Sequence, residues 1–329
     1  MTTDPLLHEA VLAGDPPYRY RYDPHVTVAI DDIHNRVEEV PEQPRIYANY
    51  LVELSTGRSL TRQMNMIAET ALKYPFDDDL AEVVDGAIGH SISTYFTHCG
   101  ARKYLSKREG DWCNYPSLAH AKDLGILCRA LKRRCAAVDP TQWDKPLPGS
   151  FVEFGFSSQV KTRLEEHQNH INSNYLMNLL EAISKAKLGS GFGFDRFVLY
   201  HIHGLDLVEL AEVYWTRCGQ GYSKNGGGCS YAAAGGSTDS RHSFTASDYD
   251  DFFDYSYSQS FVNENVDTFK AKFAKRVADL EAEAAAIAAG NEKMRKAFSL
   301  QQEVEDRVAE EEMILAAADD DEEEQHDAI

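Results

Sequence analysis

The sequence predicts an α+β fold, and three observations lead to this prediction. Residues 45–54 are rich in β-branched and aromatic side chains and end at a Ser-Thr-Gly turn, which is typical of a strand. Strand-like stretches also begin at Phe151 and run from Phe197 to His203. The segments between these stretches and after Val266 repeat apolar residues three and four positions apart, which indicates helices.

Length and charge set the limits of what the chain can be. Its 329 residues allow one large domain or two modest ones, with ample length for a buried core. The formal net charge of -20 is unevenly spread, because residues 45–220 contain as many basic as acidic residues. The acidity therefore lies at the two ends. A strongly basic nucleic-acid footprint is lacking, but the balanced middle leaves polyanion binding open.

Cysteine usage and the N-terminal residues indicate a cellular location. The six cysteines include no Cys-x-x-Cys pair, so a zinc ribbon is disfavoured. The first residues lack the basic and apolar regions of a signal peptide, and no apolar run reaches the length of a membrane span. We expect an intracellular protein, cytoplasmic or nuclear, with free thiols and no membrane association.

Residues 1–44 are rich in proline and acidic residues, and we expect a flexible arm lying on the domain surface. Tyrosine and arginine alternate from Tyr18 to Tyr22. These two residue types stack on nucleic-acid bases, so contact with a nucleic acid is the alternative reading of this patch.

Residues 56–149 read as a helical insert. A first helix has its apolar face at Met64, Ile67, Ala68 and Ala71 and stops before Pro75. The acidic run 77–79 suits the start of the next helix, where the helix dipole favours carboxylates, and a divalent-cation site is the alternative. A further helix spans about Ser117 to Val138. It ends in the basic run 132–134, which complements the dipole or forms a phosphate-binding face.

Residues 248–317 read as a helical region with coiled-coil spacing. The apolar seam runs through Val266, Phe269, Phe273, Val277, Leu280, Ala284 and Ile287. We expect Gly290-Asn291 to break this helix before a second run, and residues 318–329 to form an acidic disordered tail. The seam suits a homo-oligomer or a protein partner.

Three side chains following the second strand carry potential chemistry. Arg163 and His167 are four residues apart and share one helix face. Glu212 lies among apolar residues, where an unpaired charge is costly, so a metal ion or Arg163 is its expected partner. The structural alternative pairs Arg163 with a nearby acid and leaves His167 half-buried. His201 and His203 face one side of a strand and suit either a metal pair or backbone hydrogen bonds.

These residues resemble the GIY-YIG nuclease superfamily. The run Gly155-Phe156-Ser157, followed by Arg163 and His167, is similar to the second half of its signature. The order downstream is similar too, with Asn172-Ser173-Asn174, an amphipathic helix, a strand and then a helix bearing Glu212. Arg45-Ile46-Tyr47 is the best candidate for the first motif strand.

The resemblance implies a small three-stranded antiparallel sheet flanked by helices and a metal-dependent DNA endonuclease activity. Arg163 would stabilise the transferring phosphate, and Glu212 would hold a single Mg²⁺ or Mn²⁺ ion. Tyr47 would be the tyrosine of the first motif, and His167 matches a frequent helix histidine.

The sequence departs from the family in three respects. Arg45 replaces the first motif glycine, and the insert separates two strands that normally form a tight hairpin. Glu153 stands where the second motif has a tyrosine, and it would serve as a base or as a second metal ligand. The alternative to an endonuclease is therefore a catalytically degenerate GIY-YIG-like module that binds nucleic acid or protein.

Overall fold

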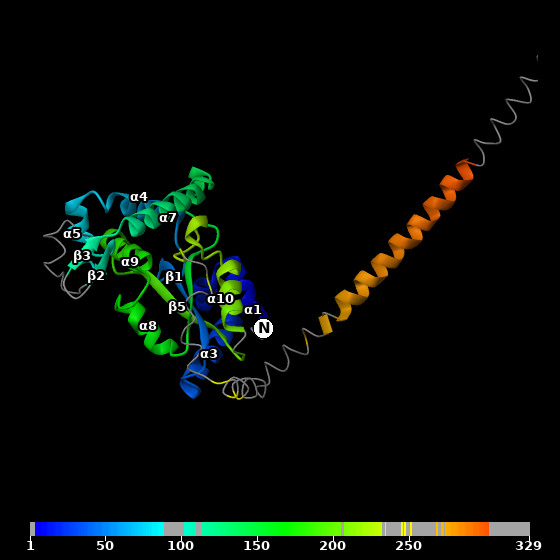
Figure 1. The fold of residues 1–329 in the computed structure, drawn as a ribbon, viewed down its shortest axis with the longest axis horizontal. Helices are drawn as coiled ribbons and strands as arrows, with labels where there is room; N and C mark the ends of the chain where they lie inside the picture. The colour runs from blue at the N-terminus through cyan, green and yellow to red at the C-terminus, as the bar shows by residue number, and fades with distance from the viewer. Residues whose placement is uncertain are drawn as a thin grey trace, which may run out of the picture. The chain divides into compact units, whose positions relative to one another are not determined.

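The computed structural model describes residues 4–88, 102–109, 113–204, 207–231 and 274–302, with a few isolated residues between 234 and 272. It is an α+β structure with a small three-stranded antiparallel sheet (Figure 1). The chain divides into two units, Met1–Asn265 and Val266–Ile329, which are treated separately below.

Strand β1 (Arg45–Glu53) lies in the centre of the sheet. It pairs antiparallel with β4 (Phe151–Ser157) on one edge and with β5 (Phe192–His201) on the other. The three predicted strands are confirmed, although β5 begins at Phe192 rather than Phe197. The early start follows from the pairing, because the end of β1 at Glu53 is opposite Phe192.

Helices of the insert cover one face of the sheet. Helices α4 (Thr61–Lys73) and α7 (Leu118–Ala136) pack with α9 (Tyr175–Leu188), and their apolar sides enclose Leu51, Phe151 and Phe192 in a buried cluster. The predicted face of Met64, Ile67, Ala68 and Ala71 is fully buried there. The insert is therefore part of the core rather than an appendage.

The insert is not purely helical as predicted. Besides α5 (Asp78–Gly86) and the short η1 (Pro140–Gln142), it contains an antiparallel pair of strands, β2 (Ser106–Glu109) and β3 (Cys113–Pro116). Their four-residue sequences show no apolar alternation, so the periodicity gave no sign of them. The acidic run before α5 is confirmed as a cap, because Asp77 Oδ1 accepts the Leu80 amide at 3.0 Å.

The flexible N-terminal arm was a wrong prediction. The segment forms helices α1 (Pro5–Ala13), α2 (Pro16–Tyr22) and α3 (Pro24–Glu39). Each helix starts with an aspartate followed by a proline, a pair well suited to the first turn, so the proline content marks helix starts. The buried residues of these helices are Leu7, Ala10, Val11, Pro16, Pro17, Val26, Ala29, Ile30, Ile33 and Val37.

These helices and α10 (Leu207–Cys218) flank the other face of the sheet (Figure 1). Helix α8 (Val160–Gln168) follows β4, with Gln159 at its N-cap and the Ser157 hydroxyl accepting the Gln159 amide at 3.0 Å. The spacing Asp206-x-x-Glu209 predicts a capping box at the start of α10, and Asp206 lies outside the described residues.

Arg45, at the start of β1, is fully buried. Its Nη1 donates to the carbonyls of Pro41 and Gln43 at 3.1 and 2.7 Å, and its Nε donates to His201 Nδ1 at 3.1 Å. Its Nη2 donates to the carbonyls of Arg36 and Val40 at the end of α3. One side chain therefore ties α3 to the start of β1 and the end of β5.

In the second unit, residues 274–302 form one continuous helix. The predicted break at Gly290-Asn291 is wrong, since an interior glycine costs a helix only about 1 kcal/mol. The start of the seam before residue 274, except for isolated positions, and the predicted tail at 318–329 lie outside the described residues. Among the described helices, none combines the length and the apolar composition that a membrane crossing requires.

The burial of α3 generates a test of the N-terminal helices as core elements. Ile30→Ala is expected to lower the free energy of unfolding by about 2–5 kcal/mol, because it leaves a cavity at a fully buried position. Val28→Ala on the same helix removes a side chain that is 59% exposed and should change stability by less than about 0.5 kcal/mol. Urea unfolding measures both. Equal effects would mean that α3 is not part of the cooperative core.

Candidate functional site

Helix α8 brings two of the predicted residues to the hydroxyl of a third. Arg163 and His167 lie one turn apart on α8, and Tyr47 lies on the central strand β1. The Tyr47 hydroxyl is 2.8 Å from His167 Nε2, and Arg163 Nε donates to the same oxygen at 3.4 Å. Residues from positions 47 and 163–167 thus meet above one face of the sheet.

Gly155 makes this meeting possible. It is the register partner of Tyr47 across β1 and β4. A Cβ atom at Gly155 would lie 2.3 Å from the Tyr47 hydroxyl oxygen and 2.4 Å from Cζ. Because real Cβ atoms essentially never approach so closely, only glycine lets the phenol cross over β4. The close approach of the Tyr47 ring therefore explains why position 155 is a glycine.

The hydrogen-bond directions follow from the donors. Arg163 has no acceptor, so its N–H points to the Tyr47 oxygen and the phenol proton faces His167 Nε2. Burial, together with the charges of Arg163 and Arg196, lowers the pKa of His167 to about 3. The imidazole is therefore neutral at pH 7 and accepts a hydrogen bond from the phenol. Its Nδ1 is buried and has no partner among the described residues.

Tyr47 itself remains protonated. Burial and the charge of Glu153 raise the pKa of the Tyr47 phenol well above its usual value, Arg163 opposes the rise, and Glu212 adds to it. Glu212 lies on α10, whereas the hydrogen bonds described above join Tyr47 to residues of α8. Glu212 is 9% exposed, and its helix α10 packs against β4.

The Arg163 guanidinium donates to protein acceptors through Nε and Nη1 and is partly exposed to solvent. Its Nη1 donates to Glu166 Oε2 at 3.0 Å and to the Asn172 carbonyl at 2.7 Å, and the side chain is 30% exposed. Within the described part of the chain, its Nη2 has no hydrogen-bond partner. Arg163 is therefore paired with a nearby acid, as the structural alternative expects. Its Nη2 remains as a donor for an anion.

Glu153 occupies a structural position. Its Oε2 accepts from Asn49 Nδ2 at 2.9 Å and its Oε1 from Asn174 Nδ2 at 3.4 Å. Burial raises the pKa of the Glu153 carboxyl, while the two amides and Arg163 oppose the rise. Asn174 also caps α9 and donates to the Cys229 carbonyl at 3.0 Å, so Glu153 fixes β1, α9 and the segment after α10 together.

Sequence reasoning missed a second group of polar residues beside this site. Glu181 on α9 accepts from His170, Lys185 and Arg196 at 3.1 to 3.4 Å, and its side chain is 4% exposed. These interactions outweigh the effect of burial and lower the pKa of the Glu181 carboxyl. Asn49 inside an apolar strand and Glu181 between Leu180 and Ala182 were the signals in the sequence that could have revealed them.

The other metal-ligand candidates have structural partners. His201 Nδ1 accepts from Arg45, and His203 Nδ1 lies 3.1 Å from Gln43 Nε2. Cys128 and Cys135 are free thiols on the buried side of α7, in the core. No group of three or more His, Cys, Asp or Glu side chains in the described ranges is placed to hold a metal ion.

No protein-family model, curated protein or solved structure matches this chain.

The Gly155 contact generates a test of the site geometry. Gly155→Ala is expected to displace the Tyr47 ring and to destabilise the fold by about 1–3 kcal/mol, as overpacking does. Gly191→Ala is the matched control, because a Cβ there would have no neighbour within 4 Å. Thermal unfolding gives the stability, and the nuclear magnetic resonance signals of the Tyr47 ring report its displacement. If Gly155→Ala behaved like the control, the phenol would not lie over β4.

Proposed function

We propose that the first unit is a metal-dependent endonuclease-like domain that hydrolyses phosphodiester bonds in DNA. The observation that carries the proposal is the meeting of Arg163 and His167 at the Tyr47 hydroxyl, over Gly155. Glu212 is on α10, which packs against the two strands that carry Tyr47 and Gly155. An arginine donor, a phenol, a neutral imidazole and a carboxylate in one site suit the transfer of a phosphoryl group. The match to the GIY-YIG order of elements supports this choice.

Each residue has a role in the proposed reaction. The open Nη2 of Arg163 would bind a nonbridging oxygen of the scissile phosphate and stabilise the negative charge that develops there. The Tyr47 hydroxyl would orient the attacking water, and neutral His167 would hold the phenol in position by accepting its hydrogen bond. Glu153 is proposed to position Asn49 and Asn174 rather than to act as a base, because amide donors occupy both its oxygens.

The donor set fits a magnesium ion. Glu212 offers hard carboxylate oxygens, and Mg²⁺ typically keeps several waters and takes one or two protein carboxylates. Glu212 would hold the ion beside Tyr47, and Mn²⁺ suits the same ligand. When bound, the ion polarises the phosphate and stabilises the leaving oxygen.

A catalytically degenerate module is the second candidate, and Glu153 is the observation that favours it. A buried carboxyl tied to two asparagines stands where the family has a tyrosine. With that phenol absent, the same surface would bind a nucleic-acid phosphate or a protein carboxylate at Arg163 without cutting. Binding without cleavage would select this candidate.

Self-association is proposed for the second unit. The helix 274–302 leaves Val277, Leu280, Ile287, Met294 and Phe298 exposed, by 38% to 68%. A soluble helix with such an apolar side is stabilised by a partner helix.

The proposed hydrolysis makes a sharp prediction for two variants. Glu212→Gln and Arg163→Ala are each expected to lower Mg²⁺-dependent cleavage of a DNA panel by about 10²–10³-fold, because each removes a preorganised charge. Branched, nicked and single-stranded DNA belong in the panel. Lys145→Ala is the control, since this exposed lysine lies after η1 and its side chain takes no part in the hydrogen bonds described for the site.

Circular dichroism of every variant separates loss of folding from loss of chemistry. Equal cleavage by the parent, both site variants and the control would contradict the proposal. A parent that binds DNA in an Arg163-dependent way and never cuts it would establish the degenerate module instead.

A further inference from the structure

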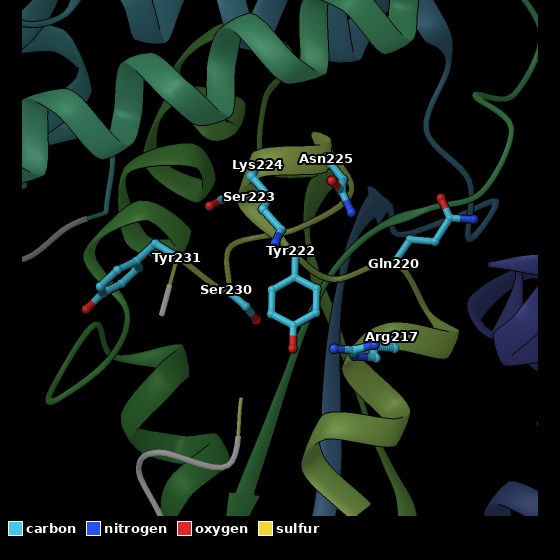
Figure 2. Close-up of a pocket in the computed structure, with 8 residues that line it drawn as sticks. All are labelled: Arg217, Gln220, Tyr222, Ser223, Lys224, Asn225, Ser230 and Tyr231. Carbon is cyan, nitrogen blue, oxygen red and sulfur yellow. The ribbon is translucent and has the colours of Figure 1, made fainter. Parts of the chain in front are cut away.

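A pocket of ≈ 500 Å³ lies at the C-terminal end of α10 (Figure 2). Arg217 from α10 and Lys224 from η2 (Ser223–Asn225) line it, together with Tyr222 and Ser230. The described lining contains two cations and no carboxylate, although the whole chain carries a net charge of -20. The pocket therefore selects for an anion.

The pocket's cations are available. Neither Arg217 nor Lys224 forms an ion pair within the described residues, and Lys224 Nζ lies 5.6 Å from the centroid of the Tyr222 ring. Figure 2 shows the head groups of Arg217 and Lys224 both directed toward Tyr222. A phosphate beside that ring would meet a guanidinium and an ammonium group, the two side chains that proteins use for phosphate.

The walls of the pocket are fixed by backbone contacts. The Ser223 amide donates to the Ser230 carbonyl at 3.0 Å, and the Ser230 amide donates to the Gly221 carbonyl at 3.1 Å. Gly228 lies so close to Val152 of β4 that a Cβ would be 1.8 Å from its carbonyl oxygen. This glycine-rich segment is therefore held against the sheet, and the pocket is largely preformed.

The pocket adjoins the candidate site. Cys229, next to Ser230, accepts through its carbonyl from Asn174, which also holds Glu153. Arg217 is five residues after buried Glu212 on the same helix, about 7.5 Å along its axis and about 140° around it, so it faces the solvent-exposed side. A strand whose phosphate lies at Arg163 and Glu212 could therefore continue into the pocket.

We propose that this pocket binds the nucleotide adjacent to the scissile phosphate. Its phosphate would accept hydrogen bonds from Arg217 and Lys224, and its base would stack on the Tyr222 ring. The volume suits one nucleotide, since small-molecule sites usually measure about 300–1,000 Å³. This inference deepens the proposed nuclease function and rests on it for the identity of the ligand.

The test measures binding separately from cleavage. The full chain is titrated with 5′-phosphorylated trithymidylate in metal-free buffer by isothermal calorimetry. Arg217→Gln/Lys224→Gln should weaken binding by roughly tenfold or more, and Tyr222→Leu by roughly tenfold. Lys145→Gln/Lys187→Gln removes the same charge from exposed positions outside the pocket and should bind like the parent.

The outcomes distinguish this inference from the proposed function. If the pocket variants weaken binding and Glu212→Gln leaves cleavage unchanged, the pocket stands and the nuclease mechanism falls. If cleavage needs Glu212 but the pocket variants bind and cut like the parent, the pocket inference alone is overturned. Inorganic phosphate binding as tightly as the trinucleotide would overturn the stacking of a base.

A second inference concerns the helix 274–302, and a different observation carries it. Its apolar side follows heptad spacing, with Val277, Ala284, Asn291 and Phe298 at a positions and Leu280, Ile287 and Met294 at d positions. Asn291 is the single polar residue among these seven positions, and Gln301 takes the following d position. An asparagine at one a position specifies register and oligomeric state in coiled coils at a cost in stability.

The flanking charges complement a second copy in parallel. Arg276 at a g position would face Glu281 at the following e position of the partner helix, an attractive pair. The geometry points to a parallel two-stranded coiled coil of two copies of this chain, with the two Asn291 side chains opposite each other. Val277 at a with Leu280 at d is the one heptad of this seam whose residue types favour two strands.

Light scattering and disulfide cross-linking of the full chain test this dimer. The parent should be a dimer, Leu280→Glu/Ile287→Glu a monomer, and Leu300→Glu, which changes an exposed residue outside the seam, a dimer. Met294→Cys should cross-link to its own copy on oxidation, because equal d positions meet only in a parallel pair. A monomeric parent, or a dimer without this added cross-link, would overturn the inference.

Discussion

The antiparallel pairing of β1 with two distant strands is the constraint on which the rest of the structure depends. Because β4 and β5 pair with opposite edges of β1, Tyr47 is opposite Gly155 and Asn49 lies between Glu153 and Arg196. Side chains alternate between the faces of a strand, so this register sets these polar residues toward one side. A shift of this register by one residue would turn Tyr47 and Asn49 to the other face of the sheet, and the site would not form.

The buried polar side chains on that face are stabilised by hydrogen bonds and ion pairs with other residues rather than by water. Burial is costly for an unpaired carboxylate, and Glu153 is held by two amides while Glu181 is held by three cationic or imidazole groups. Burial also keeps His167 neutral, so that the positive charge of the site is concentrated on the partly exposed Arg163. An anion entering from solvent therefore meets the guanidinium first.

Helices outside the three strands cover both faces of the small sheet. The insert supplies α4 and α7 to one face, and the N-terminal helices supply the other. A three-stranded sheet cannot bury both faces by itself, which explains why residues far from the motif strands contribute so many core positions. The buried Arg45 then joins the N-terminal helices to the sheet by its bonds to α3 carbonyls.

The sequence by itself determined the three strands of the main sheet and several helix faces, because local periodicity and turn residues encode them. Tyr47, Arg163 and His167 were selected by their resemblance to a family pattern of residues. It did not reveal the N-terminal helices, since proline suggests irregular chain until the preceding aspartates are recognised as caps. Nor did it reveal β2 and β3, or the structural bonds of Glu153. Those were decided by tertiary structure, because a carboxylate acquires its role from the neighbours that folding brings to it from distant parts of the chain.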